Sequence, residues 1–95
     1  MDGQGAATTR ILEIVNEKGL HARAAAKFVE TVERFDACAT VRRDGMEASG
    51  DSIMGLLMLA ASKGTTIEIE TRGGEAGALS DALAALVAAR FGEDM

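Results

Sequence analysis

The stretch TTIEIET, residues 65–71, is the part of the chain that most directly predicts the fold. Apolar and acidic residues alternate along it, so that Ile67 and Ile69 share one side while Glu68 and Glu70 share the other. Because successive side chains of a strand point to opposite faces of its sheet, this alternation predicts one buried face and one face in water. Such strands are typical of an antiparallel sheet that helices cover on one side.

Three more strands and three helices are predicted around this stretch. Asp44-Gly45 is a strong hairpin signal, because both residues tolerate a positive φ, and it joins short strands at 39–43 and 46–48. The first strand is expected at 10–16, where apolar residues lie two apart. Periodic apolar residues and capping signals predict the helices. These are expected at residues 22–35, 53–61 and 75–91.

The predicted elements follow in the order strand, helix, strand, strand, helix, strand, helix, without repeats or linkers. This order predicts a single α+β domain, which a chain of 95 residues accommodates. The small and polar residues 1–8 are expected to form a disordered tail. The folded domain is expected at residues 9–92.

Composition argues against several classes of function. The formal net charge is −5, whereas nucleic acid and anionic membranes reward clustered Lys and Arg. Phenylalanine is the only aromatic residue type, so no platform for stacking bases is visible. No apolar run reaches the ~18 residues of a membrane span, and the start MDGQGAATTR lacks a signal-peptide core. A cytoplasmic protein is therefore expected.

The sequence predicts neither a metal site nor a disulfide. Cys38 is the only cysteine and His21 is the only histidine. A lone thiol cannot form an internal disulfide, and one imidazole with no nearby thiol is too few ligands for a metal. Cys38 is interpreted as a small buried residue.

His21 stands where the first strand's loop becomes the first helix, in the segment Gly19-Leu20-His21-Ala22-Arg23. An imidazole titrates near pH ~6.5, so it is a neutral nucleophile at cellular pH. The first turn of a helix offers unpaired N–H groups to a phosphate, and Arg23 adds a guanidinium. The alternative is structural: His21 caps the helix, and Arg23 is a solvated charge.

Two segments carry a resemblance to a known family. GLHARAAAKFV, residues 19–29, resembles the active-site segment of HPr, the histidine-containing phosphocarrier of the phosphoenolpyruvate-dependent phosphotransferase system, whose pattern is Gly-Leu-His-Ala-Arg-Pro-Ala. GDSIMGL, residues 50–56, resembles the family's regulatory segment, and Ser62-Lys63-Gly64 also matches. The likeness covers roughly residues 9–92. It implies an open-faced β-sandwich, with four antiparallel strands covered on one face by three helices.

The resemblance assigns roles to particular residues. It implies that His21 is phosphorylated through Nδ1, that Arg23 steadies the phosphoryl group, and that Ser52 is phosphorylated where a regulatory kinase exists. The alternative for Ser52 is a plain helix N-cap, and both roles are compatible. The chain is then a phosphoryl carrier, which needs no cofactor and turns over no substrate of its own.

The resemblance also implies a docking surface. In the family, a face of the second helix docks the partners beside the active histidine. The predicted docking residues are Leu20, Ala24, Ile53, Met54 and Leu57. The opposite face of the helix is expected to cover the sheet with Leu56, Leu59 and Ala60. The alternative for Met54 and its neighbours is that they belong to the core.

Two departures from the family pattern bear on these roles. Ala24 replaces the family's proline, which removes a restraint on φ in the first turn. Asp51 stands where many members have lysine, so a negative charge lies beside Ser52. The departure at Ala24 favours the nitrogen-related regulatory branch of the system over sugar uptake.

The expected partners are enzyme I, an enzyme IIA-type acceptor and, for Ser52, an HPr serine kinase/phosphorylase, and the chain is expected to be a monomer. A second hypothesis is a regulatory docking domain of the same fold in the nitrogen-related branch, which acts by binding without phosphorylation. The retained pair of His21 and Arg23 argues against it, because docking alone requires neither residue. A third, a module for a small ligand, has only the fold in its favour.

Overall fold

The computed structural model describes residues 7–95. The disordered tail predicted for residues 1–8 therefore falls mostly outside the described residues. Ala7 and Thr8 lie inside them and correct that prediction, because they belong to the first strand and pair with Arg72 and Thr71. The sheet thus includes residues 7 and 8, ahead of the predicted domain start at residue 9.

The described residues form one four-stranded antiparallel sheet. Its strands are β1 (Ala7–Glu13), β2 (Cys38–Arg43), β3 (Met46–Ser49) and β4 (Thr66–Arg72). They lie in the order β1-β4-β2-β3, so the last strand in sequence pairs with both β1 and β2. β2 and β3 pair across the predicted turn, where Asp44 and Gly45 both have a positive φ.

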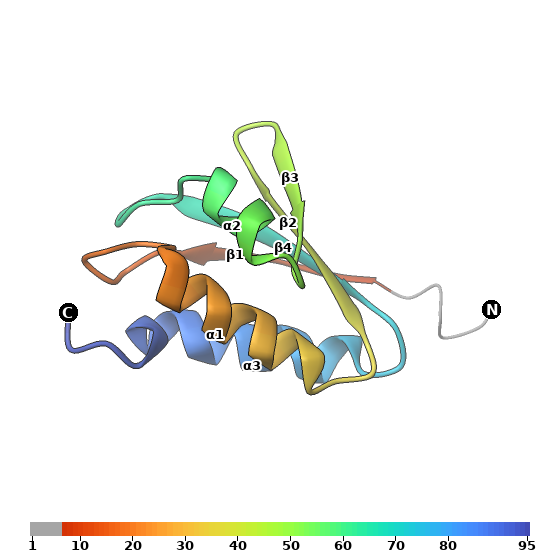
Figure 1. Cartoon of the computed structure of the whole chain (residues 1–95). Coiled ribbons are helices and arrows are strands. Elements are labelled where there is room, and N and C mark those ends of the chain that lie inside the picture. Colours follow the sequence, from red (N-terminus) through yellow and green to blue (C-terminus); the bar gives the residue numbers. More distant parts are fainter. Residues whose placement is uncertain (1–6) are drawn as a thin grey trace.

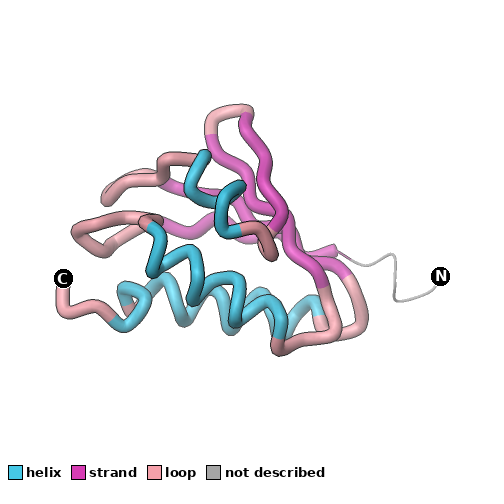
Figure 2. Tube along the Cα trace, viewed as in Figure 1, coloured by secondary structure: helices cyan, strands magenta, loops and turns pink. Residues whose placement is uncertain are grey.

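Three α-helices lie on one face of this sheet. They are α1 (Ala22–Glu33), α2 (Ile53–Met58) and α3 (Ala76–Ala88), and a 3-10 turn, η2 (Arg90–Gly92), follows α3. Figure 1 shows α1 and α3 running alongside each other, with the short α2 near the start of α1. Figure 2 shows that the strands form the other layer. The predicted α+β open-faced β-sandwich is therefore confirmed.

The alternation in β4 divides the sheet as predicted. Its two isoleucines are buried beneath the helices, and its two glutamates lie on the open face. There Arg42 of β2 pairs with Glu70 at 2.7 Å, with Glu68 at 3.3 Å, and with Glu47 of β3 at 2.9 Å. These ion pairs join three strands, which leaves the helical side free for the apolar core.

Cys38 corrects the prediction of a small buried residue, because it is exposed. It is the first residue of β2, and its neighbour Ala39 is buried against the helices. Since adjacent residues of a strand point to opposite faces, Cys38 lies on the open face of the sheet.

The first strand and the second helix are placed differently from their predictions. β1 ends at Glu13 and not at residue 16, because the chain leaves the sheet after Ile14, whose N–H still donates to the carbonyl of Thr65 at 2.9 Å. α2 ends at Met58 and not at residue 61, because Ala60 adopts a φ of 51° and turns the chain. Both changes bring loops toward the start of α1.

The third helix also ends early, at Ala88 and not at residue 91. Arg90 and Phe91 have positive φ values of 58° and 55°, which end the helix, and Phe91 is buried in the core. The C-terminus consequently lies beside the loop that precedes α1 (Figure 1), where the N–H of Glu17 donates to the carbonyl of Met95 at 3.1 Å.

Candidate functional site

The loop before α1 is fixed by a glycine. Gly19 has a φ of 67°, a conformation that residues with a Cβ rarely adopt. A Cβ on Gly19 would also lie 2.5 Å from the carbonyl oxygen of Ala61. The next N–H, from Leu20, donates to that same oxygen at 2.9 Å. The close approach of the two backbones therefore sets where His21 begins the helix.

His21 is the N-cap of α1. Its backbone is extended, and its Nδ1 accepts a hydrogen bond from the backbone N–H of Arg23 at 3.3 Å. Its carbonyl accepts the first helical bond, from the N–H of Ala25, at 2.8 Å. The structural interpretation of His21 as a cap is therefore correct, and the same contact places Nδ1 at the positive end of the helix.

The other ring nitrogen of His21 faces two residues that the sequence did not single out. Nε2 contacts a carboxylate oxygen of Glu93, which follows η2. The side-chain amide of Asn16 donates to the second oxygen of Glu93 at 2.9 Å and to the carbonyl of Gly19 at 2.9 Å. The hydrogen bond from His21, followed by the one from Asn16, holds the pKa of Glu93 below its ordinary value of 4.5.

Sequence reasoning missed Glu93 and Asn16 for identifiable reasons. Glu93 is separated from His21 by 72 positions, and it lay beyond a helix that was predicted to continue to residue 91. Asn16 was assigned to the first strand. The one signal in the sequence was that Asn16 ends a segment predicted as a strand, where asparagine is depleted.

Three basic and three acidic side chains line a hollow of about 460 Å³ beside the contact between His21 and Glu93. Its lining consists of Glu17, Lys18, Arg23, Lys27, Gly92, Glu93, Asp94 and Met95. The side chain of Arg23 is exposed, and within residues 7–95 it forms no ion pair. A second hollow, of about 520 Å³ at the β2–β3 turn, shares no lining residue with the first.

Ser52 is the N-cap of α2, as predicted. Its hydroxyl oxygen accepts a hydrogen bond from the N–H of Gly55 at 2.9 Å, and the residue is half-buried. The carboxylate of Asp51 accepts a hydrogen bond from the hydroxyl of Ser49 at 2.6 Å. Asp51 is thus engaged with the end of β3 while its charge stays beside Ser52.

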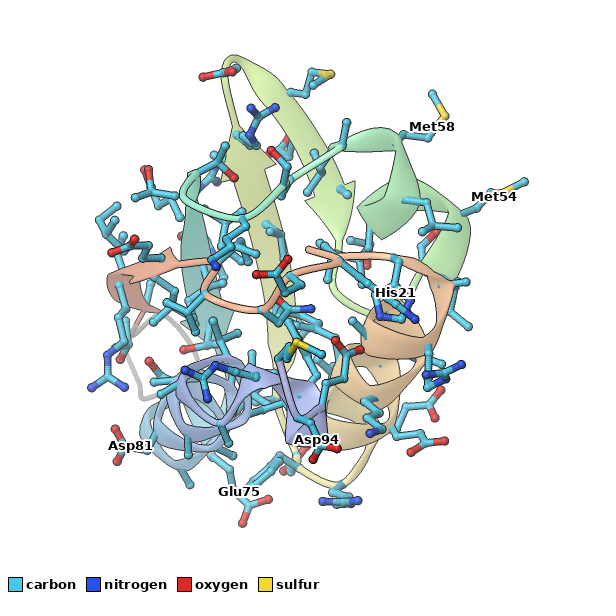
Figure 3. All side chains as sticks on the ribbon, turned by 90° about the vertical axis from the view of Figure 1, so that its left-hand side faces the viewer. His21, Met54, Met58, Glu75, Asp81 and Asp94 are labelled. Carbon is cyan, nitrogen blue, oxygen red and sulfur yellow. The ribbon has the colours of Figure 1, made fainter. Side chains whose placement is uncertain are left out.

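The predicted docking residues divide into two groups. Ile53 and Met54 are exposed, Met54 to 72%, and Leu57 is half-buried. Figure 3 shows that Met54 and Met58 point outward from α2 on the side of the molecule where His21 lies. Met58, which is also 72% exposed, belongs with this surface.

Leu20 and Ala24 correct the prediction of docking residues, because their side chains are 4% and 0% exposed. Each packs into the core where α1 meets the loop, so neither side chain is offered to a partner. On the far side of α2, Leu56 and Leu59 are buried as predicted. Ala60 is exposed instead, because its positive φ carries it past the end of the helix.

The chain resembles known proteins over most of its length. Residues 8–89 match the family model PTS-HPr, described as "PTS HPr component phosphorylation site". The chain is 46% identical over 82 residues to a phosphocarrier protein HPr of Neisseria meningitidis, covering 86% of this chain and 92% of the relative. It is 44% identical over 84 residues to a phosphocarrier protein NPr of Shewanella violacea, covering 88% and 92%.

Solved structures agree. A crystal structure of HPr-C-His from Thermoanaerobacter tengcongensis superposes with a TM-score of 0.88 at 34% identity, over 93% of this chain and 99% of the other. A structure of an HPr dimer from the same organism gives a TM-score of 0.72 at 36% identity, over 86% and 94%. The chain belongs to the HPr family of phosphocarrier proteins of the phosphotransferase system.

No helix within residues 7–95 has the length and apolarity needed to cross a membrane. In the same range, no three residues among His, Cys, Asp and Glu come together as a candidate metal site.

Proposed function

We propose that the chain accepts a phosphoryl group on Nδ1 of His21 from enzyme I and passes it to an enzyme IIA-type acceptor. The observation that carries this proposal is the position of Nδ1, which faces the backbone N–H of Arg23 at the start of α1. The N-terminus of a 12-residue helix is favourable for an anion, because its first N–H groups are unpaired and the helix dipole is positive there.

The transfer step balances without a cofactor. The lone pair of Nδ1 forms the bond to phosphorus, while the bond from phosphorus to the donor's atom breaks and leaves its electron pair on the donor. The phosphoryl oxygens then take hydrogen bonds from the first-turn N–H groups and from the exposed guanidinium of Arg23. The chain is therefore a group carrier, because a second protein must remove the phosphate before the chain returns to its starting state.

Partner proteins dock, in this proposal, on the surface of α2. Ile53, Met54 and Leu57, together with Met58, form an apolar patch next to the proposed phosphorylation site. Transfer between two proteins needs both sites to meet with water largely excluded, and exposed methionines adapt to more than one partner. The same surface would therefore serve both the donor and the acceptor in turn.

The direct test is incubation with phosphoenolpyruvate and enzyme I, followed by intact mass at neutral and at acidic pH. Phosphohistidine is labile in acid and phosphoserine is not, so a single acid-labile phosphate is expected. Failure to take up phosphate from an active enzyme I would contradict the proposal. HPr and NPr relatives match at 46% and 44% identity. The phosphorylated protein is therefore mixed with acceptors of the sugar branch and with acceptors of the nitrogen branch.

Regulation at Ser52 is a separate part of the proposal. A serine kinase would add charge at the N-cap of α2, where a phosphate suits the helix dipole but changes the docking patch. A Ser52→Asp variant is expected to keep its melting temperature and to accept phosphate from enzyme I more slowly. The proposal also includes a cytoplasmic location and a monomeric state, and sedimentation of the purified chain tests the monomer.

A further inference from the structure

Three side chains from distant parts of the chain form one connected group. Asn16 lies in the loop before α1, His21 begins α1, and Glu93 follows η2. Asn16 is fully buried, while the side chains of Glu93 and His21 are only 12% and 24% exposed. Contacts that water largely cannot replace are worth more than the same contacts at the surface.

The two sides of the imidazole ring define one protonation state. A carboxylate only accepts hydrogen bonds, so the contact with Glu93 requires the proton on Nε2. A backbone N–H only donates, so the contact with Arg23 requires a lone pair on Nδ1. Both neighbours therefore select the tautomer whose free lone pair is on Nδ1, and they do so independently.

Asn16 fixes the carboxylate that makes this selection. Its amide nitrogen donates both to Glu93 and to the carbonyl of Gly19. Its Oδ1 has no protein partner among the described residues. The amide thus acts here through its two N–H groups, which bind the C-terminal segment to the turn that carries His21.

We infer that Glu93 is a positioning residue for the transfer. It holds His21 as the Nε2–H tautomer, and it stabilises the positive charge of the ring once Nδ1 is phosphorylated. Asn16 in turn holds Glu93 in place. This inference rests on the proposed function, because it explains how His21 presents Nδ1. When the bond to phosphorus forms, Nδ1 shares its lone pair and the ring becomes more positive, next to a carboxylate that is already there. The proton stays on Nε2 throughout.

The contact is not needed merely to hold the C-terminus. The N–H of Glu17 donates to the carbonyl of Met95, and Nζ of Lys27 donates to the carbonyl of Phe91 at 2.6 Å. The burial of Phe91 fixes the same segment. A variant of Glu93 is therefore expected to keep its C-terminal segment docked while it loses control of the ring.

Glu93→Gln is the most informative variant because of Asn16. The amide of Asn16 donates to one oxygen of Glu93, so a glutamine that keeps this bond must turn its own NH₂ toward Nε2 of His21. That donor selects the opposite tautomer, with the proton on Nδ1. If the glutamine turns the other way, its carbonyl oxygen can still accept from Nε2–H, but its NH₂ then meets the NH₂ of Asn16. The first orientation reverses the selection, and the second keeps it only by giving up the bond through which Asn16 holds residue 93.

The test combines nitrogen NMR with transfer kinetics. His21 is the only histidine, so its two ring nitrogen shifts are read without assignment variants. They are recorded over a range of pH, because several charged groups line the hollow beside Glu93. These are Glu17, Lys18, Arg23, Lys27 and Asp94. The matched control is Asp94→Asn, which makes the same charge change one residue away at an exposed position.

The wild type and Asp94→Asn are expected to show the Nε2–H tautomer, and Glu93→Gln is expected to show a mixture or the Nδ1–H form. Phosphorylation of Glu93→Gln by enzyme I should be slower by roughly ten- to a hundred-fold, by analogy with the loss of a residue that orients a metal-binding histidine. Glu93→Asp, which keeps the charge, should recover part of the rate. Glu93→Ala, which removes the carboxylate, serves as the test if Glu93→Gln does not fold.

A Glu93→Gln variant with the wild-type tautomer and the wild-type rate would overturn the inference. The same holds for Glu93→Ala if glutamine unfolds the domain. Failure of the wild type to accept phosphate would instead overturn the proposed function. The tautomer measurement is made without phosphate, so the two failures are distinguishable.

Discussion

At the scale of the residue, His21 is the N-cap of α1, and in the proposed function it is also the nucleophile, two roles that sequence reasoning treated as alternatives. As the N-cap, Nδ1 accepts the N–H of Arg23, and as a nucleophile the same lone pair would attack phosphorus. In that proposal the two uses follow each other in time, because a phosphoryl oxygen would replace the lone pair as acceptor for the same helix terminus. The cap therefore orients the ring before transfer.

Substitutions of His21 separate these roles. His21→Ala is expected to lose about 1 kcal/mol of stability, the usual cost of an N-cap, and to take no acid-labile phosphate. His21→Asn keeps a good capping side chain, so it should melt near the wild-type temperature and also take no phosphate. Thermal melting and intact mass after incubation with enzyme I check both. Acid-labile phosphate on His21→Asn would place the acceptor elsewhere.

Gly19 offers a second test, of the backbone that carries His21. Gly19→Ala is expected to destabilise the domain by more than the roughly 1–2 kcal/mol of a positive φ alone, because its Cβ would lie 2.5 Å from the carbonyl oxygen of Ala61. Gly45→Ala is the control, since Gly45 also has a positive φ but has no atom within 4 Å of the added Cβ. Chemical denaturation measures both free energies of unfolding. Equal losses in the two variants would show that the close approach to Ala61 costs nothing.

At the scale of the element, α2 is a helix with two different sides. Leu56 is fully buried against the sheet, and Met54 is 72% exposed. The helix is only six residues long, so its stability comes from packing and from the cap at Ser52 rather than from its own hydrogen bonds. The packing of its buried side therefore holds its exposed apolar side in place.

A charge placed on the exposed side of α2 should lower the affinity for partners, whereas a charge on the buried side should lower the stability of the fold. Met54→Glu is expected to change stability by no more than about 0.5 kcal/mol, as at most exposed positions, and to weaken binding to enzyme I and to the acceptor, because a charge must be desolvated in the contact. Leu56→Glu is the control and should lose several kcal/mol, roughly the cost of a buried unpaired charge. Melting and calorimetric titration give the two quantities. Normal binding of both partners by a folded Met54→Glu would remove this surface from the docking proposal.

The sequence predicted the sheet but not the ends of two helices. Local alternation in β4 and the turn at Asp44-Gly45 predicted the sheet, because strand periodicity and turn chemistry are properties of neighbouring residues. The ends of α2 and α3 were wrong, because non-glycine residues there adopt a positive φ that only tertiary packing explains. Glu93 was missed for the same reason, since the turn after α3 is what brings it to His21.

At the scale of the whole molecule, three glutamates tie distant segments together, and each has its pKa held below the ordinary value of 4.5. Glu17 is paired with Lys63, Glu70 with Arg42 and then Arg72, and Glu93 with His21 and then Asn16. Such carboxylates favour the folded state while they are ionised. The fold is therefore expected to weaken in acid at defined places.

The open face of the sheet provides the clearest test of this pH dependence. The pKa of Glu70 is lowered mainly by its hydrogen bond to Arg42. A carboxylate with a lower pKa in the folded state contributes stability that is complete above its ordinary pKa and is lost as the pH falls through the folded one. Glu70→Gln should therefore melt below the wild type at pH 7, and the two melting temperatures should converge as the pH falls below 4.5.

Glu13→Gln is the matched control for Glu70→Gln, because Glu13 also lies at a strand in this sheet, is exposed, and forms no ion pair within residues 7–95. Its melting temperature should follow that of the wild type at every pH. Circular dichroism melts between pH 7 and pH 3 in low salt supply the comparison, and added salt should narrow the gap at pH 7 because exposed ion pairs are screened. A gap between Glu70→Gln and the wild type that stays constant down to pH 3 would mean that Glu70 acts through packing, and that its charge does not hold β2 to β4.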